Sequence, residues 1–142
     1  MAAEGGVRTF DLSVVTPEGA AFEGEAEMVI VPGAAGEIGV LARHAPLVAM
    51  LKAGEIRVKA GSDWQSFAAG PGYFKVQQDR AIALVDDAVL AKEIDVERAR
   101  KQLEEAQAEL ERIERGESDA DRWQIEQRIK HAENQLTTAG GA

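Results

Sequence analysis

The chain has 142 residues, a formal net charge of −9, no cysteine and only two histidines. Without cysteine there is no disulfide scaffold, thiolate metal site or cysteine nucleophile, and two histidines are too few for a multi-histidine metal site. The acidic balance argues against general binding to a polyanion. We therefore expect no metal site and no nucleic-acid partner.

The apolar runs of the chain are short. None approaches the roughly 18 residues of a membrane-spanning helix, and residues 1–8 lack the apolar core of an export signal. These features predict a soluble intracellular protein.

The composition changes near residue 90. All four prolines lie before this point, no glycine occurs in residues 73–115, and charged residues fill 19 of the first 90 positions but 22 of the last 52. Proline and glycine punctuate short strands, whereas a charged, glycine-free stretch suits exposed helices. We therefore predict a strand-rich domain at residues 1–90 and a helical domain at 91–142, with the boundary between Val89 and Ile94.

The first domain shows a period of two. Apolar positions alternate with polar ones at Phe10, Leu12 and Val14, at Ile56, Val58 and Ala60, at Phe74 and Val76, and again at Ile82 and Leu84. Turn-forming residues such as Pro32-Gly33 and Gly61-Ser62-Asp63 separate these runs. Many short strands with frequent turns predict an antiparallel β-sandwich, in an α+β chain whose helices come last.

The second domain shows helical periodicity. One apolar seam consists of Val96, Ala99, Leu103, Ala106, Leu110 and Ile113, and a second of Ile125, Ile129, Ala132 and Leu136. Asp95 is suited to cap the first helix, and Gly116 is suited to end it. Ser118, with Asp121 three residues later, is a variant of the capping box and predicts the start of the second helix. The short connection predicts an antiparallel two-helix hairpin. Trp123 lies beside the seam, either as a hairpin core residue or as an anchor for a partner.

Catalytic motifs are missing from the sequence. Neither His44 nor His131 belongs to a nucleophile motif, and the glycine run at residues 33–36 lacks the lysine of a phosphate-binding loop. We therefore predict a non-catalytic protein. The acidic tip of the hairpin, residues 114–121, leaves an alternative function open, in which the hairpin acts on a nucleic-acid polymerase, although acidic residues near a helix start also stabilise the helix dipole.

Residues 31–51 read VPGAAGEIGVLARHAPLVAML. With the opening FDLSVVTPEG of residues 10–19 and the IALVDDA of residues 82–88, this segment resembles the epsilon subunit of rotary F-type ATP synthases, called delta in mitochondria. The resemblance extends from about residue 8 to residue 137. Its glycines at 33, 36 and 39 suit a turn or a close strand approach.

The resemblance implies a central-stalk subunit without catalytic residues. The sandwich would bind the gamma subunit and the c-ring and couple proton-driven rotation to ATP synthesis. The hairpin would be a mobile inhibitor of ATP hydrolysis that meets the alpha and beta subunits when it extends. The protein would then be a peripheral protein on the cytoplasmic face of the bacterial plasma membrane, attached to the membrane only through the complex.

The resemblance also implies two sets of site residues on the hairpin. The predicted partner contacts are Arg98, Arg100, Lys101, Arg122, Trp123, Arg128 and Lys130, with pairing to nearby glutamates as the alternative for the basic residues. Residues 94–99 match a motif through which some bacterial members bind regulatory ATP, so Ile94, Asp95, Arg98, Ala99 and Arg128 are the candidate nucleotide site. Those members carry two arginines four apart in the second helix, whereas Arg122 and Arg128 are six apart. No other cofactor is expected.

Overall fold

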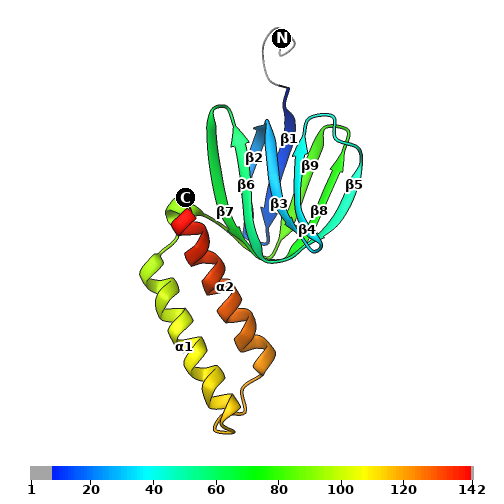
Figure 1. The fold of residues 1–142 in the computed structure, drawn as a ribbon. Helices are drawn as coiled ribbons and strands as arrows, with labels where there is room; N and C mark the ends of the chain where they lie inside the picture. The colour runs from blue at the N-terminus through cyan, green and yellow to red at the C-terminus, as the bar shows by residue number, and fades with distance from the viewer. Residues whose placement is uncertain (1–7, 142) are drawn as a thin grey trace.

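The protein folds into a layered strand domain that carries a helical hairpin at one end (Figure 1). The structure is a computed structural model that describes residues 8–141. The strands are β1 (Phe10–Thr16), β2 (Gly19–Ala26), β3 (Met28–Gly33), β4 (Gly36–Leu41), β5 (Leu47–Leu51), β6 (Gly54–Ala60), β7 (Asp63–Ala69), β8 (Gly72–Gln77), β9 (Arg80–Val85) and β10 (Ala88–Leu90). The short 3-10 helix η1 (Ala91–Glu93) leads to α1 (Val96–Glu114) and α2 (Arg122–Gly141).

The strands form one hydrogen-bonded path in the order β10-β7-β6-β3-β5-β8-β9-β1-β2, and β4 pairs with the edge of β3. At the step from β3 to β5 only Gly33 and Leu51 are paired, so the sheet bends there into two facing layers. The pairs are antiparallel except for β1 with β9, which is parallel. The predicted fold class, a β-sandwich followed by an antiparallel helical hairpin, is confirmed.

The core lies between the two layers. Three of the predicted inward-facing sets have the correct phase, because Phe10, Leu12, Val14, Ile56, Val58, Phe74 and Val76 are all buried, although Ala60 at the end of β6 is only half-buried. Phe67 of β7 joins Phe74 as the largest of the fully buried side chains. Burial of these apolar side chains is the main favourable term that stabilises the sandwich.

The prediction for β9 was wrong in its phase. The buried residues of this strand are Ala81, Ala83 and Val85, whereas Ile82 is half-buried and Leu84 is exposed. Both alternating sets of β9 are apolar, so periodicity alone does not show which of them faces the core. The larger side chains point outward, and the small alanines fill the narrow space inside.

Glycine is required in the turn between β3 and β4. Gly36 has a φ of 143°, a value that residues with a side chain rarely adopt, and a Cβ atom on Gly33 would lie 2.6 Å from the carbonyl oxygen of Gly36. The prediction that these glycines serve a turn and a close strand approach is confirmed.

The first helix begins and ends as predicted. The Asp95 carboxylate accepts a hydrogen bond from the Arg98 N–H at 3.1 Å and so caps the start of α1. At the other end Gly116 has a φ of 74°, and the N–H groups of Gly116 and Glu117 donate to the carbonyls of Ile113 and Arg112. This pair of bonds is the Schellman motif.

The start of the second helix differs from the prediction. The side chain of Asp121, not of Ser118, accepts from the Trp123 N–H at 2.9 Å, and the Asp121 carbonyl accepts the first helical bond from Ile125. The Ser118 hydroxyl instead bonds the Glu109 carboxylate of α1 and closes the turn between the helices. Trp123 is 66% exposed, so the interpretation of this residue as part of the hairpin core was wrong.

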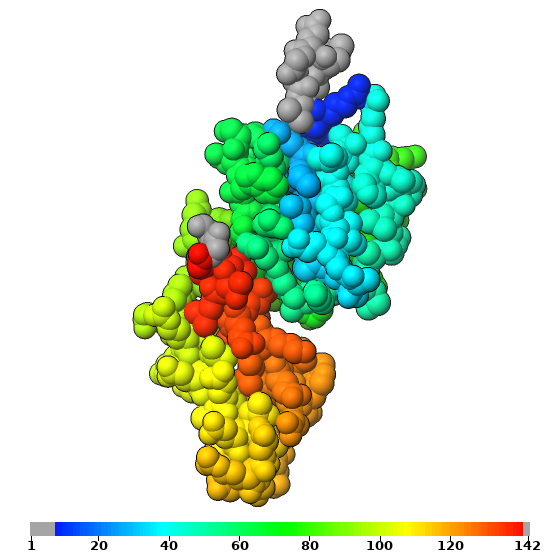
Figure 2. All heavy atoms as spheres, viewed as in Figure 1, coloured from blue at the N-terminus to red at the C-terminus, as the bar shows by residue number. Residues whose placement is uncertain are grey.

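The hairpin points away from the sandwich, and its open end packs against the strands (Figure 1, Figure 2). The last turns of α2 pack against β6, β7 and η1, while the tip between the helices extends into solvent. The 19 residues of α1 give it a length of about 29 Å. Most of the hairpin surface is therefore free of the sandwich.

Candidate functional site

Four large apolar side chains are exposed together on the outer face of one layer. They are Val48 (71% exposed) and Met50 (61%) of β5, Tyr73 (57%) of β8 and Leu84 (48%) of β9. We call this set the outer strip. Strands β5, β8 and β9 are neighbours in the sheet, so the strip crosses it at right angles to the strands.

The register of the strands places three members of the strip in one row, and Val48, opposite Lys75, in the next row. Met50 lies opposite Tyr73, and Tyr73 lies opposite Leu84. The row continues to the half-buried Val15 of β1, which pairs with Leu84. Residues directly opposite on one face have their Cβ atoms about 5 Å apart, so these side chains form a continuous surface.

The strip makes its strands apolar on both faces. In β8 the residue after Tyr73 is Phe74, which is fully buried in the core, and in β9 the exposed Leu84 lies between the buried Ala83 and Val85. A strand in a sheet with one solvated face ordinarily alternates apolar and polar residues. A contiguous exposed apolar patch is typical of a site where another protein binds.

Near the strip, the turn between β3 and β4 forms a shallow apolar hollow. Its walls are residues 33–38 together with Ala49 and Met50 of β5. Met50 belongs to both surfaces, so the apolar area runs from the middle of the sheet to the end of the β3–β4 hairpin.

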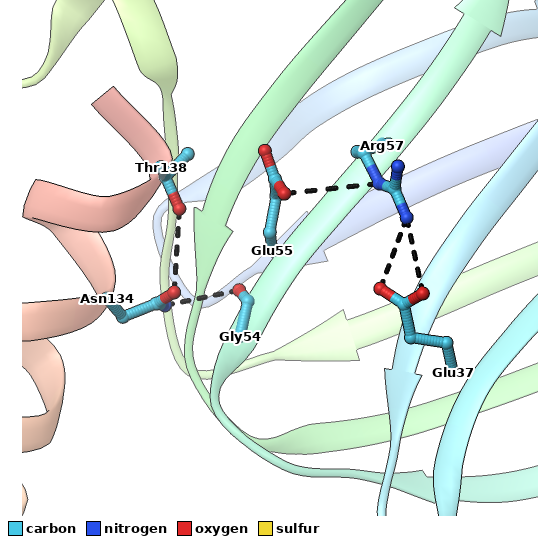
Figure 3. Close-up of polar contacts among 6 residues, drawn as sticks. All are labelled: Glu37, Gly54, Glu55, Arg57, Asn134 and Thr138. Atoms are coloured by element: carbon cyan, nitrogen blue, oxygen red, sulfur yellow. Dashed lines mark hydrogen bonds and ion pairs between the residues drawn. The ribbon is translucent and has the colours of Figure 1, made fainter. Parts of the chain in front are cut away.

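The hairpin docks on the sandwich through polar contacts. The side-chain amide of Asn134 in α2 donates to the carbonyl oxygen of Gly54 (Figure 3) and to that of Ala69, at 3.1 Å each. The Thr138 hydroxyl, one turn further along α2, contacts the amide oxygen of Asn134 at 3.5 Å. His131 of the same helix lies 3.7 Å from the carboxylate of Asp87, which precedes β10.

The candidate nucleotide residues do not all meet. Asp95 caps α1, and Ile94 and Ala99 are buried. Arg128 of α2 lies near a later part of the first helix. Arg128 lines a cavity of about 810 Å³ between the helices, with Gln102 and Glu105 of α1 among its walls but neither Asp95 nor Arg98. Nucleotide binding at this set of residues stays a prediction.

The predicted basic partner contacts divide into two kinds. Arg100 pairs with Glu97 at 3.3 Å and Arg122 with Glu126 at 3.6 Å, as the alternative interpretation expected. Arg98, Lys101, Arg128 and Lys130 are exposed on the hairpin surface. Trp123 is exposed near the start of α2, and its role as a partner anchor stays a prediction.

The two histidines and one residue of the acidic tip make local structural contacts. His44 Nδ1 lies 2.7 Å from the carbonyl oxygen of Ala45, and His131 faces Asp87. In the tip, Asp121 caps α2. Within residues 8–141 no group of three or more metal-ligating side chains comes together, and no helix in this range is long and apolar enough to cross a membrane.

Comparison with known proteins assigns the strand domain to a family. Residues 9–91 match the family model for the "ATP synthase, Delta/Epsilon chain, beta-sandwich domain". The chain belongs to the ATP synthase delta/epsilon family. This region contains all four residues of the outer strip.

Relatives of this family match the hairpin as well. The chain is 39% identical to the ATP synthase epsilon chain of Halalkalibacterium halodurans over 93% of its own length and 98% of that protein. It is 36% identical to the ATP synthase epsilon chain of a Synechocystis strain, over 94% of this chain and 98% of that protein. The resemblance stated from the sequence is confirmed.

A solved structure shows the same fold. A chain in the cryo-EM structure of the Euglena gracilis mitochondrial ATP synthase, which contains OSCP, F1 and the c-ring, superimposes with a TM-score of 0.77 at 23% identity. The match covers 100% of this chain and 88% of that one. At this identity the likeness concerns the fold, with the sandwich and the hairpin in the same chain order.

Proposed function

We propose that this chain is the non-catalytic epsilon-type subunit in the central stalk of a rotary, proton-translocating ATP synthase. In this proposal the sandwich binds the gamma subunit and the c-ring and couples rotation of the ring to ATP synthesis. The complex holds the chain at the cytoplasmic face of the bacterial plasma membrane. Family membership and the two-part fold support the proposal.

The outer strip is the observation that carries the proposal. A subunit that transmits torque must bind its partner tightly. The binding energy at protein interfaces is concentrated in a few buried aromatic and apolar side chains. The outer strip offers a tyrosine, a methionine, a leucine and a valine on a rigid sheet. We assign the gamma subunit to the outer strip and the c-ring to the adjoining β3–β4 hollow.

The hairpin serves as the inhibitor of ATP hydrolysis in this proposal. The hairpin packs against the strands mainly through the last turns of α2, with His131 near Asp87, so release would break few contacts and leave both helices intact. The exposed Arg98, Lys101, Arg128 and Lys130 then meet acidic segments of the alpha and beta subunits. Two packings of similar free energy are the requirement for such a switch.

Co-purification from membranes tests the proposal. The full chain, tagged and expressed in its own organism, is isolated under mild detergent, and the bound proteins are identified by mass spectrometry. We expect the alpha, beta, gamma and c subunits of ATP synthase. A different set of partners, in particular a nucleic-acid polymerase, would overturn the assignment and favour the acidic-tip alternative.

A further inference from the structure

The docked hairpin rests on small and polar side chains. The buried residues near the contact include Ala91 of η1, Ile94 directly after it, Thr138 of α2, and Ala68 and Ala69 of β7. Large side chains such as Phe67 point instead into the sandwich core. Because all of these residues but Ile94 have small side chains, the hydrophobic contribution to docking is modest. Polar contacts therefore have a large share in deciding where the hairpin lies.

Asn134 makes the most specific of these polar contacts. Gly54 and Ala69 face each other in the β6–β7 ladder, and the Asn134 amide nitrogen donates to both of their carbonyl oxygens; the bond to Gly54 is drawn in Figure 3. Each carbonyl oxygen has two lone pairs and each side-chain amide has two N–H groups, so both bonds form at once. One side chain thereby joins α2 to two strands.

The amide is held in the orientation that docking needs. Thr138 lies four residues after Asn134 on the same face of α2, and its hydroxyl donates to the amide oxygen. The two carbonyl bonds, with this longer contact beside them, place the oxygen toward the helix and the nitrogen toward the strands. Thr138 itself is fully buried.

We propose that the Asn134 amide is the latch that sets the balance between the docked and the released hairpin. Its loss shifts the hairpin toward the released state without unfolding the sandwich or the helices. The effect on ATP hydrolysis rests on the proposed function, but the docking equilibrium belongs to the chain alone. The His131–Asp87 contact, 3.7 Å long and partly exposed, has a secondary role.

The Asn134 hydrogen bonds favour the docked hairpin but are weak enough for the hairpin to be released. A neutral hydrogen bond makes only a modest net contribution, because water replaces the partner when the bond breaks. On release the Asn134 amide and both carbonyl oxygens become accessible to water, so none of them is left buried and unpaired. We expect loss of the amide to raise the ratio of released to docked hairpin about tenfold.

Two variants change the latch in different ways. Asn134→Ala removes the donor and raises helix propensity, so it does not weaken α2 itself. Asn134→Asp keeps the size but replaces the N–H donors by a negative charge that faces two carbonyl oxygens, so we expect a larger shift than for alanine. Gln107→Ala, which removes an exposed amide from α1, is the matched control.

The distance between spin labels on the full chain measures docking directly. The chain has no cysteine, so Ser62→Cys on the β6–β7 turn and Glu104→Cys on α1 are labelled selectively. The parent and the Gln107→Ala control should share one narrow distance distribution. Asn134→Ala and Asn134→Asp should add a second, broader population, with an unchanged far-UV circular dichroism spectrum.

A second reporter detects release even when it is rare. Ala68 lies on the outer face of β7, where α2 and η1 contact the strand, and it is buried. The rate at which a thiol reagent modifies Ala68→Cys is therefore proportional to the fraction of released hairpin. We expect a rate about tenfold higher with Asn134→Ala than in the parent. Equal rates in the parent and both Asn134 variants, or an equal rise in Gln107→Ala, would overturn the latch.

The outcome separates the latch from the proposed function. A shift in docking with no change in ATP hydrolysis by the assembled complex supports the latch and contradicts the inhibitory role of the hairpin. Unchanged docking with altered hydrolysis overturns the latch and leaves the inhibitory role standing.

Discussion

Tyr73→Ala separates a partner-binding role from a structural one. Tyr73 is 57% exposed in the free protein, and an aromatic side chain buries about 150–250 Å² when it is fully covered. A partner that covers the exposed part removes about 100 Å² from water, and the retained alanine accounts for a small share of this area. At about 25 cal/mol per Å² the substitution should cost about 2 kcal/mol of binding free energy, or about 30-fold in affinity.

Binding to an ATP synthase complex stripped of this chain measures the effect. Ser62→Ala, on the exposed β6–β7 turn, is the control and should bind like the parent. Thermal unfolding compares the stability loss at these two neighbouring positions. Phe74→Ala leaves a cavity in the core and should lower the free energy of unfolding by about 3–5 kcal/mol. Tyr73→Ala should lower it by about 0.5 kcal/mol or less. Parental affinity of Tyr73→Ala, or a stability loss equal to that of Phe74→Ala, would refute the reasoning.

Three further predictions concern the hairpin. Deletion of residues 91–142 should leave a folded sandwich that still binds to the ATP synthase complex, and ATP hydrolysis by that complex should rise several-fold. Unchanged hydrolysis would show that the hairpin does not inhibit the complex. Asp95→Ala removes the cap of α1 and should cost about 1 kcal/mol of unfolding free energy, measured by urea denaturation against Glu97→Ala as control. If the predicted nucleotide site exists, calorimetric titration of the isolated protein with magnesium and ATP should give a binding heat that Arg98→Ala abolishes. The absence of a binding heat at millimolar nucleotide would exclude the site.

The fold was predictable because local patterns and packing agree. In β1 the alternation of Phe10, Leu12 and Val14 with polar residues leaves only one possible inner face. The capping residues Asp95 and Gly116 form their hydrogen bonds within one turn of the helix end. Such signals need no knowledge of distant contacts. Strand β2 was not predicted, because its sequence GAAFEGEA has no clear alternation and becomes a strand through its pairing with β1.

The outer strip was missed because it depends on which face of a strand meets the core. Ile82 and Leu84 look like core residues in the sequence, and only the packing of β9 shows that Ala81 and Ala83 take that role. The signal that would have found the strip is the presence of two apolar sets in one strand, which indicates burial on both faces.

The role of Asn134 also has no local signal. An asparagine in the middle of a helical pattern reads as an ordinary exposed polar residue, and its partners Gly54 and Ala69 lie 80 and 65 positions away. Polar contacts between distant segments follow from the packing of the whole chain, so periodicity does not reveal them.

Thiol accessibility before and after assembly tests most directly whether the outer strip is a partner interface. Tyr73→Cys and Ser62→Cys are each the single cysteine in the chain and should react at similar rates in the free protein, since both positions are exposed. In the ATP synthase purified from membranes, we predict that the thiol at position 73 is blocked while that at position 62 still reacts. Equal reactivity at both positions in the assembled complex would contradict the account.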